Sequence, residues 1–162
     1  MSQYPFGGFD DEIAIAAEIL LKSWWSMLSV REPWSDTPMD DAYGMMRPVL
    51  SELLNEGRDC DRRERTRRMM LAARKHGAFR RGQRFTPRSL QDEFDSVLNA
   101  AEAVMSEHGL STEYIADVLV LLERDVRLAL DASLAGWMRS ISSELSENPY
   151  PGSVQCGNHH PI

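Results

Sequence analysis

The chemically active side chains of this sequence are concentrated in a band of cations between positions 58 and 88. The band holds twelve of them: Arg58, Arg62, Arg63, Arg65, Arg67, Arg68, Arg74, Lys75, Arg80, Arg81, Arg84 and Arg88. Three carboxylates share the band, so its charge is +9, whereas the rest of the chain sums to −16 within a net charge of −7. A positive field of this density attracts phosphate groups or the acidic face of another helix or protein.

Two interpretations of this band stay open. The favoured one pairs it with acidic helices of the same chain or of a partner, and Asp92, Glu93 and Asp95 offer suitable carboxylates. The alternative is a nucleic-acid-associated regulator that binds phosphates, with affinity drawn largely from counterion release. The phosphate contacts would then fall to Arg62, Arg63, Arg67, Arg68, Arg81 and Arg84. Only Phe79 and Phe85 lie in the band to stack on bases, which favours the first interpretation.

A histidine and four tryptophans are further candidates for a binding site. His76 lies at the predicted end of a helix, where it can interact with the helix dipole, line a pocket or sense pH. Trp24, Trp25, Trp34 and Trp137 can form an apolar ligand pocket, although aromatic residues at helical spacing are more typical of a core. A small-ligand sensor with a pocket near Trp24 and His76 is therefore a third hypothesis.

The sequence contains no motif of a catalytic or cofactor-binding site. It lacks a Gly-rich phosphate loop, a zinc-protease helix motif and a serine elbow. We therefore predict a protein that is not an enzyme and needs no cofactor. Cys156, His159 and His160 are metal-ligand types, but they have no second ligand pair at zinc spacing, so no metal site is predicted.

Composition and termini predict a soluble protein of the cytoplasm. The longest apolar runs are interrupted by charges and fall short of the roughly 20 residues that a membrane span needs. The amino terminus lacks the basic region and apolar stretch of a secretory signal. The two cysteines, Cys60 and Cys156, lie far apart, which suits a reducing compartment. We expect a cytoplasmic location and no membrane association.

Apolar residues spaced three and four apart predict that helices position these side chains. The first helix begins near Asp10, and a loop over 31–38 separates it from a second helix that Pro48 either begins or kinks. The third helix spans about 59–76 and carries most of the arginines. Gly77 is the predicted left-handed cap at its end.

The last two predicted helices have the clearest boundary signals. Thr86 and Pro87 are a helix start, with Thr as the N-cap, and the strongly amphipathic helix that follows ends at Gly109. Ser111 caps a final helix over about 112–145. That helix is long enough to form the spine of a bundle and to reach past it.

These elements predict an all-α fold, an antiparallel bundle of four to five helices with a long C-terminal helix. No strand-like alternation bounded by hairpin turns interrupts the pattern. The bundle is expected over 10–147, with a flexible lead-in over 1–9 and a disordered tail over 148–162.

The order of several segments resembles a known family. A tryptophan on the first helix and a proline-bearing loop precede the segments PVLSELL (48–54), ARKHGAFRRG (73–82), SLQDEF (89–94) and DVRLALD (125–131). This order is similar to the helical amino-terminal domain of RsbT co-antagonist (RsbRD-type) proteins, which also heads some bacterial sensor histidine kinases. The likeness covers roughly 12–145, and its most specific part joins His76, Gly77 and Arg80 to the helix with Glu93 and Phe94.

The resemblance implies a non-catalytic sensory or docking module of bacterial signalling. In that family the domain normally precedes an output domain, such as a STAS or kinase domain. This chain departs from the pattern because its long helix leads only into a short tail, so we expect a stand-alone adapter or a fragment of a longer protein. We expect a signalling protein or a second copy of the chain as the partner. The predicted ligand or partner contacts are Trp24, His76, Arg80, Leu130 and Trp137.

Overall fold

The computed structural model describes residues 10–54 and 62–139. They form α1 (Asp10–Leu28), the short 3-10 helix η1 (Trp34–Asp36), α2 (Met39–Leu54), α3 (Arg62–Gly82), α4 (Pro87–Glu107) and α5 (Thr112–Arg139). These two ranges contain helices and connecting turns but no strand. The predicted all-α class is confirmed, and so is the long final helix, since α5 has 28 residues.

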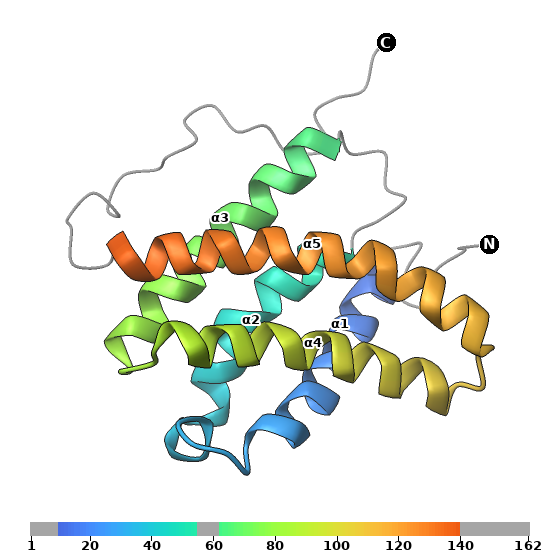
Figure 1. Ribbon diagram of the computed structural model, residues 1–162, viewed down its shortest axis with the longest axis horizontal. Helices are drawn as coiled ribbons and strands as arrows, with labels where there is room; N and C mark the ends of the chain where they lie inside the picture. Colours follow the sequence, from blue (N-terminus) through green and yellow to red (C-terminus); the bar gives the residue numbers. More distant parts are fainter. Residues whose placement is uncertain (1–9, 55–61, 140–162) are drawn as a thin grey trace.

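The helices form two crossing groups. In Figure 1, α4 and α5 run side by side as a hairpin, and α1, α2 and α3 cross behind them at steep angles. The contacts link α3 with α5 and α2, and α1 with α4 and α2. Every large helix therefore packs on at least two others, and segments far apart in the sequence meet at the centre.

The predicted start and end of α4 and the predicted start of α5 are confirmed by their caps. Thr86 Oγ1 accepts a hydrogen bond from the Ser89 backbone N–H at 3.1 Å, and the Thr86 N–H donates to Ser89 Oγ at 3.4 Å. Ser111 Oγ accepts from the Tyr114 N–H at 3.1 Å. Gly109, with φ of 74°, takes the left-handed conformation that ends α4.

The prediction for the second helix is refined at Pro48. The proline lies inside α2, which begins at Met39, well before the segment whose apolar spacing indicated a helix. The predicted loop over 31–38 contains η1, whose Trp34 side chain is buried. Gly57, the expected end of the second helix, lies outside the described residues.

The predicted end of the third helix at Gly77 is wrong. Helix α3 continues without interruption to Gly82. A Cβ built on Gly77 would lie 1.7 Å from the Ser133 carbonyl oxygen, and one built on Gly136 would lie 2.1 Å from the Arg74 carbonyl oxygen. The two glycines therefore let the backbones of α3 and α5 touch, so Gly77 serves a helix crossing and not a helix cap.

The core follows the predicted apolar stripes. The buried side chains of α4 include Leu90, Phe94, Val97, Val104 and Met105. Trp24 and Trp34 are fully buried among them, which places these two tryptophans in the core. In the part of the chain that the structure describes, no helix is both long and apolar enough to cross a membrane.

Candidate functional site

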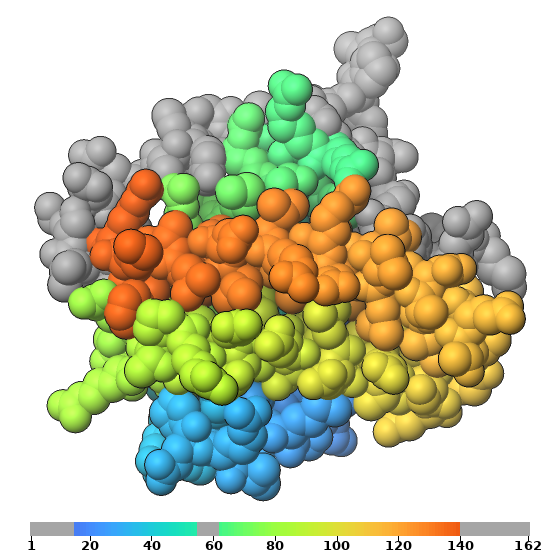
Figure 2. All heavy atoms as spheres, in the orientation of Figure 1, coloured from blue at the N-terminus to red at the C-terminus, as the bar shows by residue number. Residues whose placement is uncertain are grey.

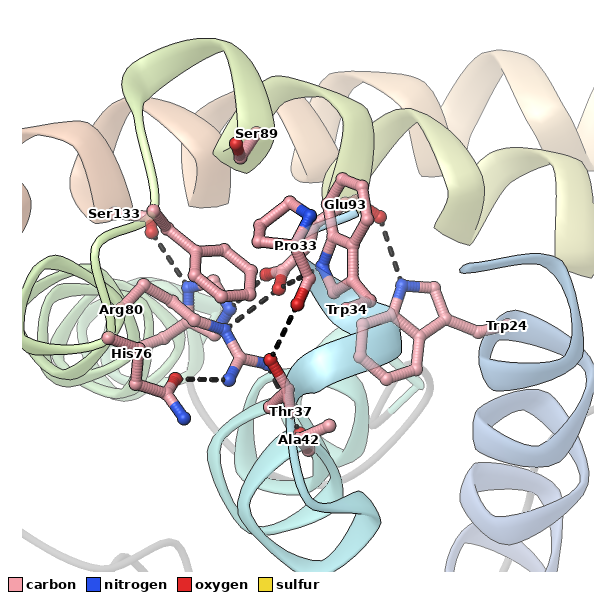
Figure 3. Close-up of polar contacts among 12 residues, drawn as sticks. Trp24, Pro33, Trp34, Thr37, Ala42, His76, Arg80, Ser89, Glu93 and Ser133 are labelled. Carbon is pink, nitrogen blue, oxygen red and sulfur yellow. Dashed lines mark hydrogen bonds and ion pairs between the residues drawn. The ribbon is translucent and has the colours of Figure 1, made fainter. Parts of the chain in front are cut away.

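Six side chains from five elements meet at one buried centre, shown in Figure 3. We call this set the Glu93 junction: Trp24 from α1, Trp34 from η1, His76 and Arg80 from α3, Glu93 from α4 and Ser133 from α5. The segments 73–82 and 89–94, which carry the most specific part of the family resemblance, supply its charged members.

The Glu93 side chain is the hub of the junction. Its Oε2 lies 2.5 Å from His76 Nε2, and its Oε1 lies 2.8 Å from Arg80 Nε. Trp34 Nε1 donates a hydrogen bond to Oε1 at 2.8 Å. Trp24 Nε1 donates to the main-chain oxygen of Glu93 at 3.0 Å. One residue of α4 therefore connects to α1, η1 and α3.

The partners of Glu93 extend the junction to α2 and α5. His76 Nδ1 lies 2.8 Å from Ser133 Oγ, so both ring nitrogens have a polar neighbour. The Arg80 guanidinium donates to Gln83 Oε1 at 2.8 Å and to the Ala42 carbonyl oxygen at 3.4 Å. The junction thus links all the described helices.

Aromatic rings pack beside the charged groups. The His76 ring stands edge-on to Phe94 at 5.3 Å between centroids. The Arg80 guanidinium lies 5.0 Å from the centre of the Phe85 ring, which is a cation–π contact. Phe85 in turn meets Trp34 edge-on at 5.6 Å. These rings exclude water, which strengthens the electrostatic attraction within the junction.

Glu93 and Arg80 hold each other in the ionised state. Burial raises the pKa of the Glu93 carboxyl, but the charges of His76 and Arg80 and the Trp34 hydrogen bond lower it more, so the pKa falls below its ordinary value. Burial lowers the pKa of Arg80, and Glu93 opposes that shift. Because arginine starts from a very high pKa, Arg80 stays a cation beside an anionic Glu93.

The closed geometry of the junction argues for a structural role. A histidine against a carboxylate has the parts of an acid–base pair. However, the side chains of His76, Arg80 and Glu93 are each 0% exposed. Within the described structure a substrate has no route to them. What the arrangement does is fix the relative positions of the helices, because a buried charge that loses its partner is strongly destabilising.

The structure gathers three of the five predicted contact residues and separates the other two. Trp24, His76 and Arg80 all belong to the junction. Leu130 is half-buried against the core on α5. Trp137 lies near the end of α5, where its Nε1 donates to the Phe85 carbonyl oxygen at 2.6 Å.

Trp137 is held by an arginine of α3 as well. The Arg81 guanidinium stacks over the Trp137 ring at 4.2 Å and donates to the Trp137 carbonyl oxygen at 3.1 Å. This contact ties the end of α5 to the turn between α3 and α4. Replacement of Trp137 would therefore disturb the fold itself.

The arginine band is divided between internal contacts and the surface. Arg65 and Arg80 are buried. Arg67 pairs with Glu64 and Arg68 with Glu52, each at 3.3 Å. The exposed members within the described residues are Arg62, Arg63, Lys75, Arg84 and Arg88. The favoured interpretation, internal pairing, therefore holds for part of the band.

The sequence pointed to Glu93 as one of several acidic partners and as part of the resemblance, but not as a buried hub, and Ser133 was not predicted as a polar contact. A signal for Glu93 was present, since it lies between Leu90 and Phe94 on the apolar face of an amphipathic helix. A carboxylate on that face requires a buried cation. Ser133 gave a weaker signal as the one hydroxyl in the apolar stripe of α5.

The metal-ligand types noted in the sequence fall in parts of the chain that the structure does not describe. Cys156, His159 and His160 lie outside the described residues, as does Cys60. Among the residues that are described, no group of three or more His, Cys, Asp or Glu side chains is placed to hold a metal ion.

Comparisons of the chain with protein families, with curated proteins and with solved structures found no match, so its function must be argued from its own geometry.

Proposed function

We propose that this chain is a non-catalytic regulatory domain that binds a protein partner, or a second copy of itself, through the outer face of α5. Figure 2 shows α5 lying across the surface of the molecule. The observation that carries the proposal is a row of exposed large apolar side chains on this helix. They are Val120, Leu121, Leu128 and Met138, with exposed fractions of 68%, 43%, 39% and 67%.

The spacing of these side chains fits a helix-packing surface. Leu121 and Leu128 are seven residues apart and thus share one side of α5. Charged residues accompany them, including an exposed ion pair in which Arg127 Nη2 lies 2.8 Å from Glu123 Oε1. Apolar side chains with a charged rim are the usual composition of a protein–protein interface. We call this set of four apolar residues the α5 outer face.

The closed junction supports the non-catalytic part of the proposal. Its histidine, arginine and carboxylate are buried and lie in contact with one another. The resemblance to RsbT co-antagonist amino-terminal domains supports a role in bacterial signalling in the cytoplasm, as an adapter or as the input module of a longer protein.

The test is a pair of charge substitutions on the α5 outer face, Leu121→Glu with Leu128→Glu. We expect the wild-type chain to form a homodimer, or to retain a signalling protein from nuclease-treated lysate, and the double variant to lose that assembly because buried carboxylates are costly. Light scattering gives the molar mass, and mass spectrometry identifies the retained protein.

The control is Val30→Glu, since Val30 is 81% exposed and lies after α1, away from α5. It should leave the assembly intact. A monomeric wild-type chain that retains no protein would contradict the proposal, and so would an assembly that the double variant leaves unchanged.

The exposed arginines favour nucleic-acid binding as the second candidate function. Arg84 and Arg88 are exposed at the turn between α3 and α4, and Arg62 is exposed at the start of α3. Phosphate binding there would weaken steeply with salt. Charge reversal at Arg84 and Arg88 tests it more cleanly than at Arg67 and Arg68, because the latter pair with Glu64 and Glu52. Absence of binding at low salt would remove this candidate.

A further inference from the structure

A surface groove of about 420 Å³ lies between α2 and α3. Its walls are mostly apolar, with Met45 and Pro48 from α2 facing Leu71 and Ala72 from α3. The volume falls within the range of about 300–1,000 Å³ that small-molecule sites occupy. This groove is separate from the Glu93 junction and lies on a different side of α3 from α5, which packs against Gly77.

An ion pair between α2 and α3 lies in the wall of the groove. Arg68 Nε lies 3.3 Å from Glu52 Oε2, and both residues line the groove. Burial raises the pKa of Glu52, and the charge of Arg68 opposes that shift. The Glu52–Arg68 pair contributes one charge of each sign, so it adds no net charge to the groove.

Two residues of α2 that weaken a helix interior both line the groove. Gly44 and Pro48 are four residues apart, so they lie on the same side of α2. A Cβ built on Gly44 would meet no heavy atom within 4 Å, so packing does not require a glycine there. A side chain at this position would project into open space at the groove. The glycine therefore keeps the groove open at the cost of helix propensity.

Lys75 supplies the remaining charge of the groove. It lines the groove four residues after Leu71, and its side chain is exposed. None of the described residues forms an ion pair with it. An apolar groove with one unmatched ammonium group fits a ligand with an apolar body and one anionic group.

We propose that the groove between α2 and α3 binds a small amphipathic anion. The apolar body lies against Pro48, Leu71 and Ala72, and a carboxylate or phosphate group faces the Lys75 ammonium. This binding site is independent of the α5 outer face, so either proposal can fail without the other.

The experiment is a titration of the full chain with octanoate and, separately, with phenyl phosphate. Binding is detected by calorimetry and by changes in the amide chemical shifts. Saturable binding is expected, with the largest shifts at Gly44, Ser51 and Ala72. Lys75→Glu should weaken binding at least about tenfold, the equivalent of about 1.4 kcal/mol. Gly44→Leu should abolish it, because the new side chain starts in open space at the groove and occupies it.

Two matched variants serve as controls. Gly82→Leu also places a side chain in open space, but outside the groove. Lys22→Glu makes the same charge change at an exposed position of α1. Both should bind as the wild type does. The proposal is overturned if neither probe binds saturably up to about 10 mM, a weak-ligand limit, or if the controls lose binding as strongly as Lys75→Glu and Gly44→Leu do.

Discussion

Among single residues, Glu93 is expected to affect the stability of the fold most. A carboxylate that is fully buried needs opposite charge and hydrogen bonds to offset the loss of hydration. Here His76, Arg80 and Trp34 meet its side chain and Trp24 meets its main chain. Because the four partners come from α1, η1 and α3, loss of one charge releases several elements together.

We predict that Glu93→Gln lowers the free energy of unfolding by about 3–5 kcal/mol, because it leaves the buried Arg80 charge without its partner. Asp92→Asn is the matched control on the neighbouring residue, since Asp92 pairs with the exposed Arg31 at 3.1 Å. That change should cost no more than about 1 kcal/mol. Urea unfolding gives the free energy of unfolding of both variants. Equal decreases in the two would contradict a special role for Glu93.

The lowered pKa of Glu93 also predicts a pH dependence of stability. A carboxyl whose folded-state pKa lies below the unfolded value of about 4.3 stabilises the fold above that value. The contribution is lost as the pH falls further, through the folded-state pKa. Between about pH 5 and pH 3 the free energy of unfolding should therefore fall more steeply for the wild type than for an Arg80→Met, Glu93→Gln double variant. The free energy of unfolding is measured by urea titration at each pH. If it falls equally steeply with pH in the wild type and in the double variant, the lowered pKa of Glu93 is contradicted.

The sequence allowed Trp24, His76 and Arg80 to be grouped as binding residues, and the structure does bring them together. Their setting was not predictable, because the burial of His76 depends on α3 continuing past Gly77. A helix ending there would leave His76 near solvent. Gly77 was predicted to be a left-handed cap, whereas in the structure it lies inside α3 and faces the Ser133 backbone. The glycine alone does not distinguish these two roles.

At the scale of elements, α3 and α5 cross with their backbones in close contact. Gly77 faces the Ser133 backbone and Gly136 faces the Arg74 backbone, so each helix supplies one glycine. Two such positions 59 residues apart in the sequence fix both the place and the closeness of the crossing. The crossing also sets the distance at which Ser133 Oγ meets the His76 ring.

We predict that Gly77→Ala or Gly136→Ala destabilises the protein by at least about 2–3 kcal/mol, because a methyl group there overlaps backbone that cannot move alone. Gly82→Ala is the control, since a Cβ at Gly82 meets no atom within 4 Å. It should be neutral or stabilising by up to about 1 kcal/mol. Thermal unfolding measures the stability of the three variants. A loss of stability in Gly77→Ala no larger than in Gly82→Ala would contradict the prediction, because α3 and α5 could then move apart at little cost.

Element boundaries were predictable where the signal is local. The start at Thr86 and the end at Gly109 depend on capping groups within four residues, and both predictions are confirmed. At Pro48 the sequence left two alternatives open, and the structure has the proline inside α2. Gly77 misled because α3 is stabilised by packing that overrides helix propensity. Tertiary contacts of this kind leave no trace in a single window of sequence.

At the scale of the whole molecule, the segregated charge of the sequence is reorganised by the fold. Part of the arginine band is neutralised inside, by Glu93, Glu52 and Glu64. The exposed remainder is spread along α3 and over the turn to α4. The two proposed binding surfaces, the α5 outer face and the groove between α2 and α3, lie on different sides of α3. Helix α3 therefore lies between the two proposed binding surfaces.

The long-range connections of the Glu93 junction also constrain how the chain is made. Trp24 and Trp34 precede their partner on α4, Glu93, by 69 and 59 residues in the sequence, and His76 precedes Ser133 by 57 residues. During synthesis, α1, α2 and α3 leave the ribosome before the carboxylate that neutralises Arg80. They can therefore collapse only loosely until α4 follows, and a nascent chain stalled before Glu93 presents its tryptophans and arginines to chaperones and proteases.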